Sequence, residues 1–124
     1  TMEAGAALRF TDRIALTAAK SAIYKGWDLR IDEPARKFFY MPLMHSENLC
    51  DQDRCVRLMH ERMVATGENP LLHARAHRAV IRAFGRFPTR NAALSRVSTG
   101  AELEYLASGG YGEVLRGLQS EKAA

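Results

Sequence analysis

The 124-residue sequence is short of cysteine, of β-branched residues and of long apolar runs. Its two cysteines, Cys50 and Cys55, would point about 140° apart on one helix, so they are badly placed to form a disulfide. No apolar stretch approaches the roughly 20 residues that a membrane-crossing helix needs. The first residues also lack a basic segment followed by an apolar one, as in a secretory signal. These absences predict a cytoplasmic protein with no membrane contact.

The sequence also has no segment in which residues of one charge sign are concentrated. Lys and Arg number 18 against 14 Asp and Glu, which gives a formal net charge of +4 and favours acidic partners. The basic residues are spread along the chain, and only Arg86, Arg90 and Arg96 form a partial group. Nucleic-acid binding needs a basic face with stacking aromatic residues, so the sequence argues against it.

Helix-forming residues dominate what is there. Ala, Leu, Arg and Glu are frequent, and apolar residues recur every three or four positions. No pair of alternating β-branched runs joined by a hairpin turn occurs, which argues against a sheet. We therefore predict an all-α antiparallel array of about five helices that forms one domain over residues 1–124.

Capping residues and glycines set the expected helix limits. Asn48 should cap the third helix and Thr99 the fifth, where Glu102 completes a capping box. Proline at position 42 should kink or end the second helix, while Gly26, Gly67, Gly85 and Gly109 should follow helix ends. The expected helices span residues 6–25, about 32–43, 49–65, 69–84 and 99–108, and residues 111–119 form a short further helix or fray.

Two long motifs resemble a known family. The first is Phe39-Tyr40-Met41-Pro42-Leu43-Met44-His45-Ser46-Glu47, followed by Asp51-Gln52. The second is Phe84-Gly85-Arg86-Phe87-Pro88, followed by Arg90-Asn91, Leu94, Arg96, Ser98-Thr99 and Glu102. Both are similar to motifs of the bacterial family called Domain of Unknown Function 924, over roughly residues 10–106. The resemblance implies a tetratricopeptide-like fold and brings no activity and no cofactor.

The sequence departs from the family pattern at three places. Thr89 stands where the family usually has His, and Ser95 stands where it usually has Gly. Family members also carry further N-terminal helices, including an Asp-Gln-Phe-Pro-Arg-Asn-like segment, which nothing here matches. An apolar surface left uncovered usually acquires a partner. We therefore expect a homo-oligomer with Phe10, Ile14 and Phe38 as contacts.

The strongest polar constellation combines His45, Glu47 and Asp51 with Arg86, Arg90 and Arg96. Helix ends leave backbone groups without helical partners, so polar side chains gather at such places. In one interpretation the carboxylates and guanidiniums pair with one another and fix two loops. In the other, the arginines hold a phosphate or a carboxylate while His45 acts as an acid or base.

The leading functional hypothesis is a non-catalytic binding module. It would present an Arg-lined groove to a protein segment or a small anionic ligand, because helical arrays form concave surfaces. Its expected ligand-binding residues are Gln52, Arg86, Arg90, Asn91 and Arg96. The alternative is a small hydrolase-like enzyme with His45, Glu47 and Asp51 as catalytic residues.

Metal binding has only weak support in the sequence. His73 and His77 stand four residues apart on a predicted helix, as two imidazole ligands on one face would. No His-Glu-x-x-His pattern accompanies them, and His60 and Cys55 from the neighbouring helix could complete a site only if the two helix faces meet. The sequence therefore predicts no metal site.

Overall fold

The computed structural model describes residues 2–123, apart from the side chains at positions 2, 10, 122 and 123. Its described part contains six α-helices and no strand, which confirms the all-α prediction. The α-helices are α1 (Met2–Tyr24), α2 (Met41–Met44), α3 (Leu49–Arg62), α4 (Glu68–Phe84), α5 (Gly100–Ala107) and α6 (Gly110–Ala123). Three 3-10 helices lie between them: η1 (Trp27–Arg30), η2 (Ala35–Phe39) and η3 (Pro88–Arg90).

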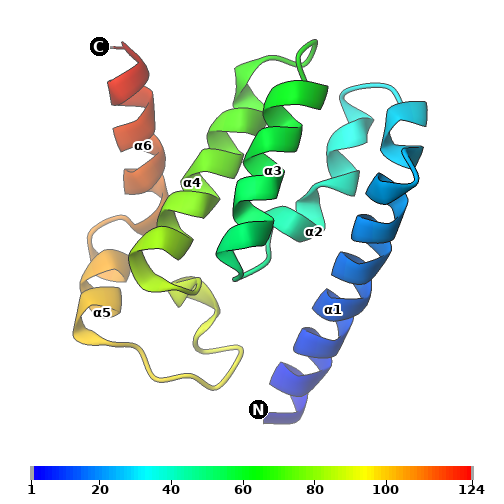
Figure 1. Cartoon of the computed structure of the whole chain (residues 1–124). Coiled ribbons are helices and arrows are strands. Elements are labelled where there is room, and N and C mark those ends of the chain that lie inside the picture. The colour runs from blue at the N-terminus through cyan, green and yellow to red at the C-terminus, as the bar shows by residue number, and fades with distance from the viewer. Residues whose placement is uncertain (1, 124) are drawn as a thin grey trace.

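The centre of the molecule is the antiparallel pair α3 and α4 (Figure 1). On one side of this pair lie α2 and the long helix α1, and on the other side lies α6. The main apolar core fills the space between α2, α3 and α4, with Tyr40, Leu43, Met59 and Met63 fully or almost fully buried. A second, smaller core forms around Val80, Ile81 and Phe87.

Three helix ends follow the predicted chemistry. The Asn48 side chain accepts hydrogen bonds from the backbone N–H groups of Cys50 and Asp51 at the start of α3. Thr99 and Glu102 form a complete capping box at the start of α5. Gly85 ends α4 with a φ of 73°, a left-handed conformation that glycine adopts without steric cost. The structure confirms these three predictions. Each of them depends only on residues that lie close together in the sequence.

The prediction of one continuous second helix is wrong. This part of the chain forms η2, preceded by Pro34, and then the short α2. Pro42 lies in the first turn of α2, where its missing N–H is not needed, so it does not kink a longer helix. Gly67 precedes α4 and does not end α3, and α6 is a full helix of 14 residues.

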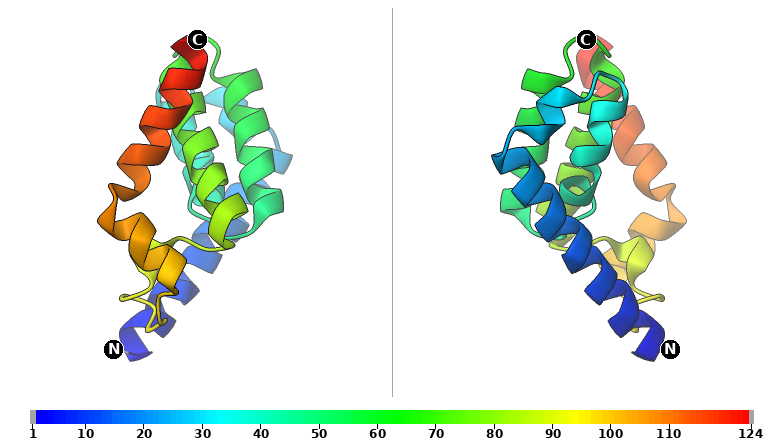
Figure 2. Two further views of the ribbon diagram at one scale, coloured as in Figure 1. Left: turned by 90° about the vertical axis from the view of Figure 1, so that its left-hand side faces the viewer. Right: turned by 90° about the vertical axis from the view of Figure 1, so that its right-hand side faces the viewer.

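The amino-terminal half of α1 reaches past α2 and approaches the loop after η3 (Figure 2). A Cβ atom added to Gly5 would lie 3.2 Å from the carbonyl oxygen of Ala93, so glycine permits this close approach. Arg9 donates to the carbonyl oxygen of Leu94 at 3.2 Å. The loop after η3 is therefore in direct contact with the amino-terminal half of α1.

The residues expected to form oligomer contacts belong to α1 and η2. Ile14 and Phe38 are exposed, with 56% and 65% of their surface accessible. The side chain of Phe10 lies outside the described residues. Self-association through these residues stays a prediction. Among residues 2–123, no helix is long and apolar enough to cross a membrane.

Candidate functional site

The two sequence motifs meet through Glu47 and Arg96. Arg96 donates from Nη1 and Nη2 to the two carboxylate oxygens of Glu47, at 2.7 and 3.0 Å. The backbone N–H of Phe87 donates to the same carboxylate at 2.6 Å. Burial alone would raise the pKa of Glu47, but these hydrogen bonds outweigh it and the pKa lies below its usual value. Glu47 therefore joins the turn after α2 to the loop after α4.

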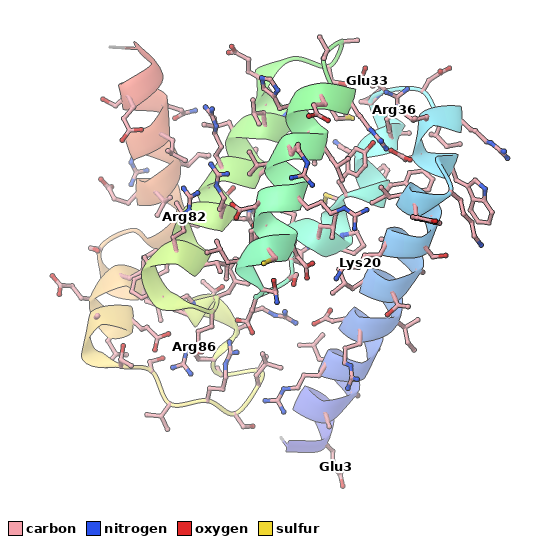
Figure 3. All side chains as sticks on the ribbon, in the orientation of Figure 1. Glu3, Lys20, Glu33, Arg36, Arg82 and Arg86 are labelled. Atoms are coloured by element: carbon pink, nitrogen blue, oxygen red, sulfur yellow. The ribbon has the colours of Figure 1, made fainter. Side chains whose placement is uncertain are left out.

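Arg86 is held by a second carboxylate. It donates from Nε and Nη2 to the two oxygens of Glu102, at 2.8 and 2.6 Å, and from Nη2 to the carbonyl of Val97 at 2.8 Å. The Arg86 guanidinium and the Thr99 backbone N–H lower the pKa of Glu102 to about 2. Figure 3 shows Arg86 beside the loop that leads to α5. This arginine therefore fixes that loop.

Three other predicted site residues also bind parts of the protein itself: Gln52, Asn91 and Asp51. Gln52 is fully buried and its Nε2 donates to the carbonyl oxygens of Met44 and Ser46, at 2.6 and 2.7 Å. Asn91 accepts from Arg96 Nε at 3.0 Å. The carboxylate of Asp51 accepts from Ser46 Oγ at 2.7 Å and pairs with Lys20 of α1 at 2.9 Å. Figure 3 shows that Lys20 points from α1 toward α3.

Two hollows share the polar residues Asp12, His45 and Arg90. The α1–α2 hollow has a volume of about 510 Å³. Its other lining residues are mostly apolar or basic: Arg9, Arg13, Ala15, Leu16, Phe38, Met41, Pro42, Ser46, Glu47 and Leu94. The aromatic hollow has a volume of about 380 Å³, and its other lining residues are His77, Val80, Phe87, Thr89, Tyr105 and Tyr111.

Arg90 is the arginine of the predicted group that borders these hollows. It donates from Nη2 to Asp12 Oδ2 at 2.5 Å, across 78 positions of sequence. Asp12 is a partly exposed carboxylate, with 45% of its side chain accessible. Arg86 and Arg96 line neither hollow. Within the described part of the chain, Asp12 is the ion-pair partner of Arg90, and the charge of Arg90 also lowers the pKa of Glu47.

The imidazole of His45 stands at the meeting point of the hollows. Partial burial lowers its pKa, the charge of Arg90 lowers it further, and the charge of Asp12 raises it. Its ring contacts the ring of His77 edge to face, with centroids 5.5 Å apart. His45 is therefore largely neutral at pH 7, next to a permanently charged guanidinium.

Hydrogen bonds hold the histidines of α4 in place. His77 Nδ1 lies 2.8 Å from the carbonyl oxygen of His73, and because a carbonyl only accepts, Nδ1 carries the proton. His73 Nδ1 lies 2.6 Å from the hydroxyl of Tyr111 on α6. Among the described residues, no group of three or more His, Cys, Asp or Glu could hold a metal ion.

Residues 3–110 match a bacterial protein family of unknown function (DUF924). The chain belongs to this family. A solved structure, the protein of unknown function ATU0120 from Agrobacterium tumefaciens, matches with 39% sequence identity and a TM-score of 0.73. The match covers 80% of this chain and 54% of that chain, so this chain spans about half the length of its relative. No curated protein matches the chain.

Two of the residues named as departures from the family pattern lie in or near the loop after α4. Ser95 has a φ of 55°, in the left-handed region that favours glycine. Thr89 is exposed and lines the aromatic hollow.

Sequence reasoning placed His45 and Arg90 correctly near one another but missed the rest of the hollows. Asp12 lies on α1, far from both motifs, and Tyr105 and Tyr111 come from α5 and α6. Nothing in the sequence indicated that these residues belong to the site. A helical pattern shows that a side chain is turned inward, and it does not show which cavity the side chain reaches.

The half-buried His77 leads to a prediction on pH and stability. Burial is the largest cause of its lowered pKa, so the folded state favours the neutral ring. As the pH falls below about 6.5, the unfolded chain binds the proton first. The free energy of unfolding should therefore decrease between about pH 7 and 5, by up to roughly 1.4 kcal/mol per pH unit for one histidine.

Urea unfolding at several pH values measures this dependence in the wild type and in His77→Gln. The variant should show a flatter decrease, because the group that takes up the proton is gone. His60→Gln is the matched control, at an exposed position of α3. Equal slopes for the wild type and His77→Gln would refute the assignment.

Proposed function

We propose that the chain is a non-catalytic binding module for a small anionic ligand, with Arg90 as the residue that holds the anion. The supporting observation is the contrast between the three arginines. Arg86 and Arg96 are each bound by both oxygens of a carboxylate, in Glu102 and Glu47, whose side chains are 3% and 25% accessible. Arg90 faces two hollows and is paired with Asp12, whose side chain is 45% accessible, so an incoming anion can displace it.

The size of the hollows favours a small ligand over a protein segment. Volumes of about 380 and 510 Å³ fall in the range of small-molecule sites. Arg9 and Arg13 add positive charge to the wall of the α1–α2 hollow. A phosphate or carboxylate group would meet Arg90 at the point where the two hollows join.

The hydrolase-like alternative lacks a convergent set of side chains. Asp51 lines neither hollow and is engaged by Ser46 and Lys20. Both oxygens of Glu47 accept hydrogen bonds, and Arg96 holds its charge. A general base needs a free carboxylate or imidazole within reach of a substrate proton. Of the three proposed catalytic residues, only His45 meets that requirement.

Calorimetric titration with inorganic phosphate and with acetate tests the proposal. Arg90→Gln should weaken the binding of either anion about tenfold or more, because a charge-assisted hydrogen bond contributes roughly 1.5–3 kcal/mol. Asp12→Asn should tighten it several-fold, because the competing carboxylate charge is removed while the side chain keeps its size.

Arg82→Gln provides the matched control. Arg82 is a surface arginine of α4 that also pairs with an aspartate, Asp53, at 3.7 Å. Its removal changes the net charge by the same amount and should leave anion binding unchanged. Equal losses in Arg82→Gln and Arg90→Gln would indicate a diffuse charge effect, and binding unchanged in Arg90→Gln would exclude the proposed site.

A further inference from the structure

The aromatic hollow differs in chemistry from its neighbour. Its walls include the rings of His77 on α4, Phe87 before η3, Tyr105 on α5 and Tyr111 on α6. The α1–α2 hollow is lined instead by aliphatic side chains such as Leu16, Met41 and Leu94, with Phe38 at its edge. Arg90 borders both hollows. It can therefore bind the anionic group of a ligand whose remaining part lies in either hollow.

The rings in the aromatic hollow are mutually inclined. His77 and Tyr111 make an angle of 63° with centroids 4.9 Å apart, and His77 and Phe87 make an angle of 75° with centroids 5.7 Å apart. Such walls present both ring edges and ring faces. A planar aromatic ring can pack edge to face against them, an arrangement that aromatic pairs prefer and that a saturated ring cannot reproduce.

Two polar groups of this hollow are hydrogen-bonded within the protein. The Tyr111 hydroxyl is engaged with His73 Nδ1 at 2.6 Å, and the Nδ1 of His77 is engaged with the His73 carbonyl. Burial raises the pKa of Tyr111 to about 12, so the phenol stays neutral. Because Val80 and the rings form most of the walls, the hollow suits an aromatic ring, and its charged lining residues are Arg90 and Asp12.

We propose that the aromatic hollow binds the ring of a small aromatic carboxylate, whose carboxylate group is held by Arg90. This inference rests on the proposed anion-binding function and names the ligand class for it. A single ring with a carboxylate fits a volume of about 380 Å³. An incoming carboxylate replaces Asp12 as the partner of Arg90, so the charge of the guanidinium stays compensated.

Titration of the wild type with benzoate, cyclohexanecarboxylate, hexanoate and inorganic phosphate tests the ligand class. Benzoate and cyclohexanecarboxylate have the same charge and nearly the same size, and only the first has an aromatic ring. Benzoate should bind about threefold or more tightly than cyclohexanecarboxylate, since ring contacts add to the burial of apolar surface.

Two variants locate the ring. Thr89→Met narrows the hollow at an exposed position, so it should fold normally, weaken benzoate binding about tenfold and leave phosphate binding unchanged. Phe38→Leu alters the edge of the α1–α2 hollow and should leave benzoate binding unchanged. Arg90→Gln should weaken both benzoate and phosphate.

The outcomes separate the two proposals. If cyclohexanecarboxylate binds as tightly as benzoate, or if Thr89→Met binds benzoate like the wild type, the aromatic ligand class is overturned while the anion site stands. If neither phosphate nor any carboxylate binds the wild type, the anion-binding function fails, and the ligand class fails with it. Phosphate binding that depends on Arg90, without benzoate binding, overturns the ligand class alone.

Discussion

Replacing Glu47 with alanine should lower the free energy of unfolding by about 2 to 3 kcal/mol and the melting temperature by about 10 °C. The variant removes the acceptor for both Arg96 nitrogens and for the Phe87 backbone N–H. Arg96 is then left partly buried, with 19% of its side chain accessible and no counter-charge. Breaking one side of such a pair costs more than the pair itself contributes.

Thermal and urea unfolding of the variant measures this loss. Asp53→Ala is the matched control, because Asp53 is a carboxylate with 47% of its side chain accessible that pairs with Arg78 at 3.4 Å. That control should cost less than about 1 kcal/mol. A double variant, Glu47→Ala with Arg96→Met, should be more stable than the sum of the two single losses predicts. If Glu47→Ala is as stable as the wild type, Glu47 has no structural role and is again a candidate catalytic base.

The sequence predicts those parts of the fold that depend on near neighbours. The Asn48 cap, the Thr99–Glu102 capping box and the glycine after α4 each need only residues within four positions. The structure of the segment from Pro34 to Met44 could not be predicted from near neighbours in the sequence. Its choice between one helix and shorter pieces depends on how Tyr40 and Leu43 enter the core, which local propensity does not encode.

The candidate site shows the same limit. Within the predicted group of acids and arginines, Glu47 pairs with Arg96. Asp51, Arg86 and Arg90 instead pair with residues outside that group, namely Lys20, Glu102 and Asp12. Which acid pairs with which arginine depends on contacts between residues far apart in the sequence, such as Arg90 with Asp12, and local patterns do not show these contacts.

The largest loss of stability should come from Asp28, which neither motif contains. Asp28 is fully buried, and its Oδ2 accepts from the Tyr40 hydroxyl at 2.5 Å and from Arg62 at 2.7 Å. These contacts join η1 to the residue between η2 and α2 and to the end of α3. Asp28→Ala leaves a tyrosine hydroxyl and a guanidinium without their acceptor, so it should cost about 4 kcal/mol.

The direction of the pH effect follows from the same contacts. Burial would raise the pKa of Asp28, but the hydrogen bonds from Tyr40 and Arg62 outweigh it and the pKa lies below its usual value. The folded state therefore favours the carboxylate, and its contribution to stability is present above about pH 4 and is lost as the pH falls through the lowered pKa. Acid unfolding should begin at a higher pH in Tyr40→Phe, which lacks one of these hydrogen bonds.

Asp32→Ala is the matched control for Asp28→Ala, because Asp32 is an exposed aspartate four residues along the same connection. Urea unfolding at pH 7 should place the two variants about 3 kcal/mol or more apart, since the exposed carboxylate has water as an alternative partner and the buried one has none. If both variants unfold at the same urea concentration, the buried contacts of Asp28 do not stabilise the fold. In that case the connection between α1 and α2 is held by apolar packing around Tyr40 and Leu43 alone.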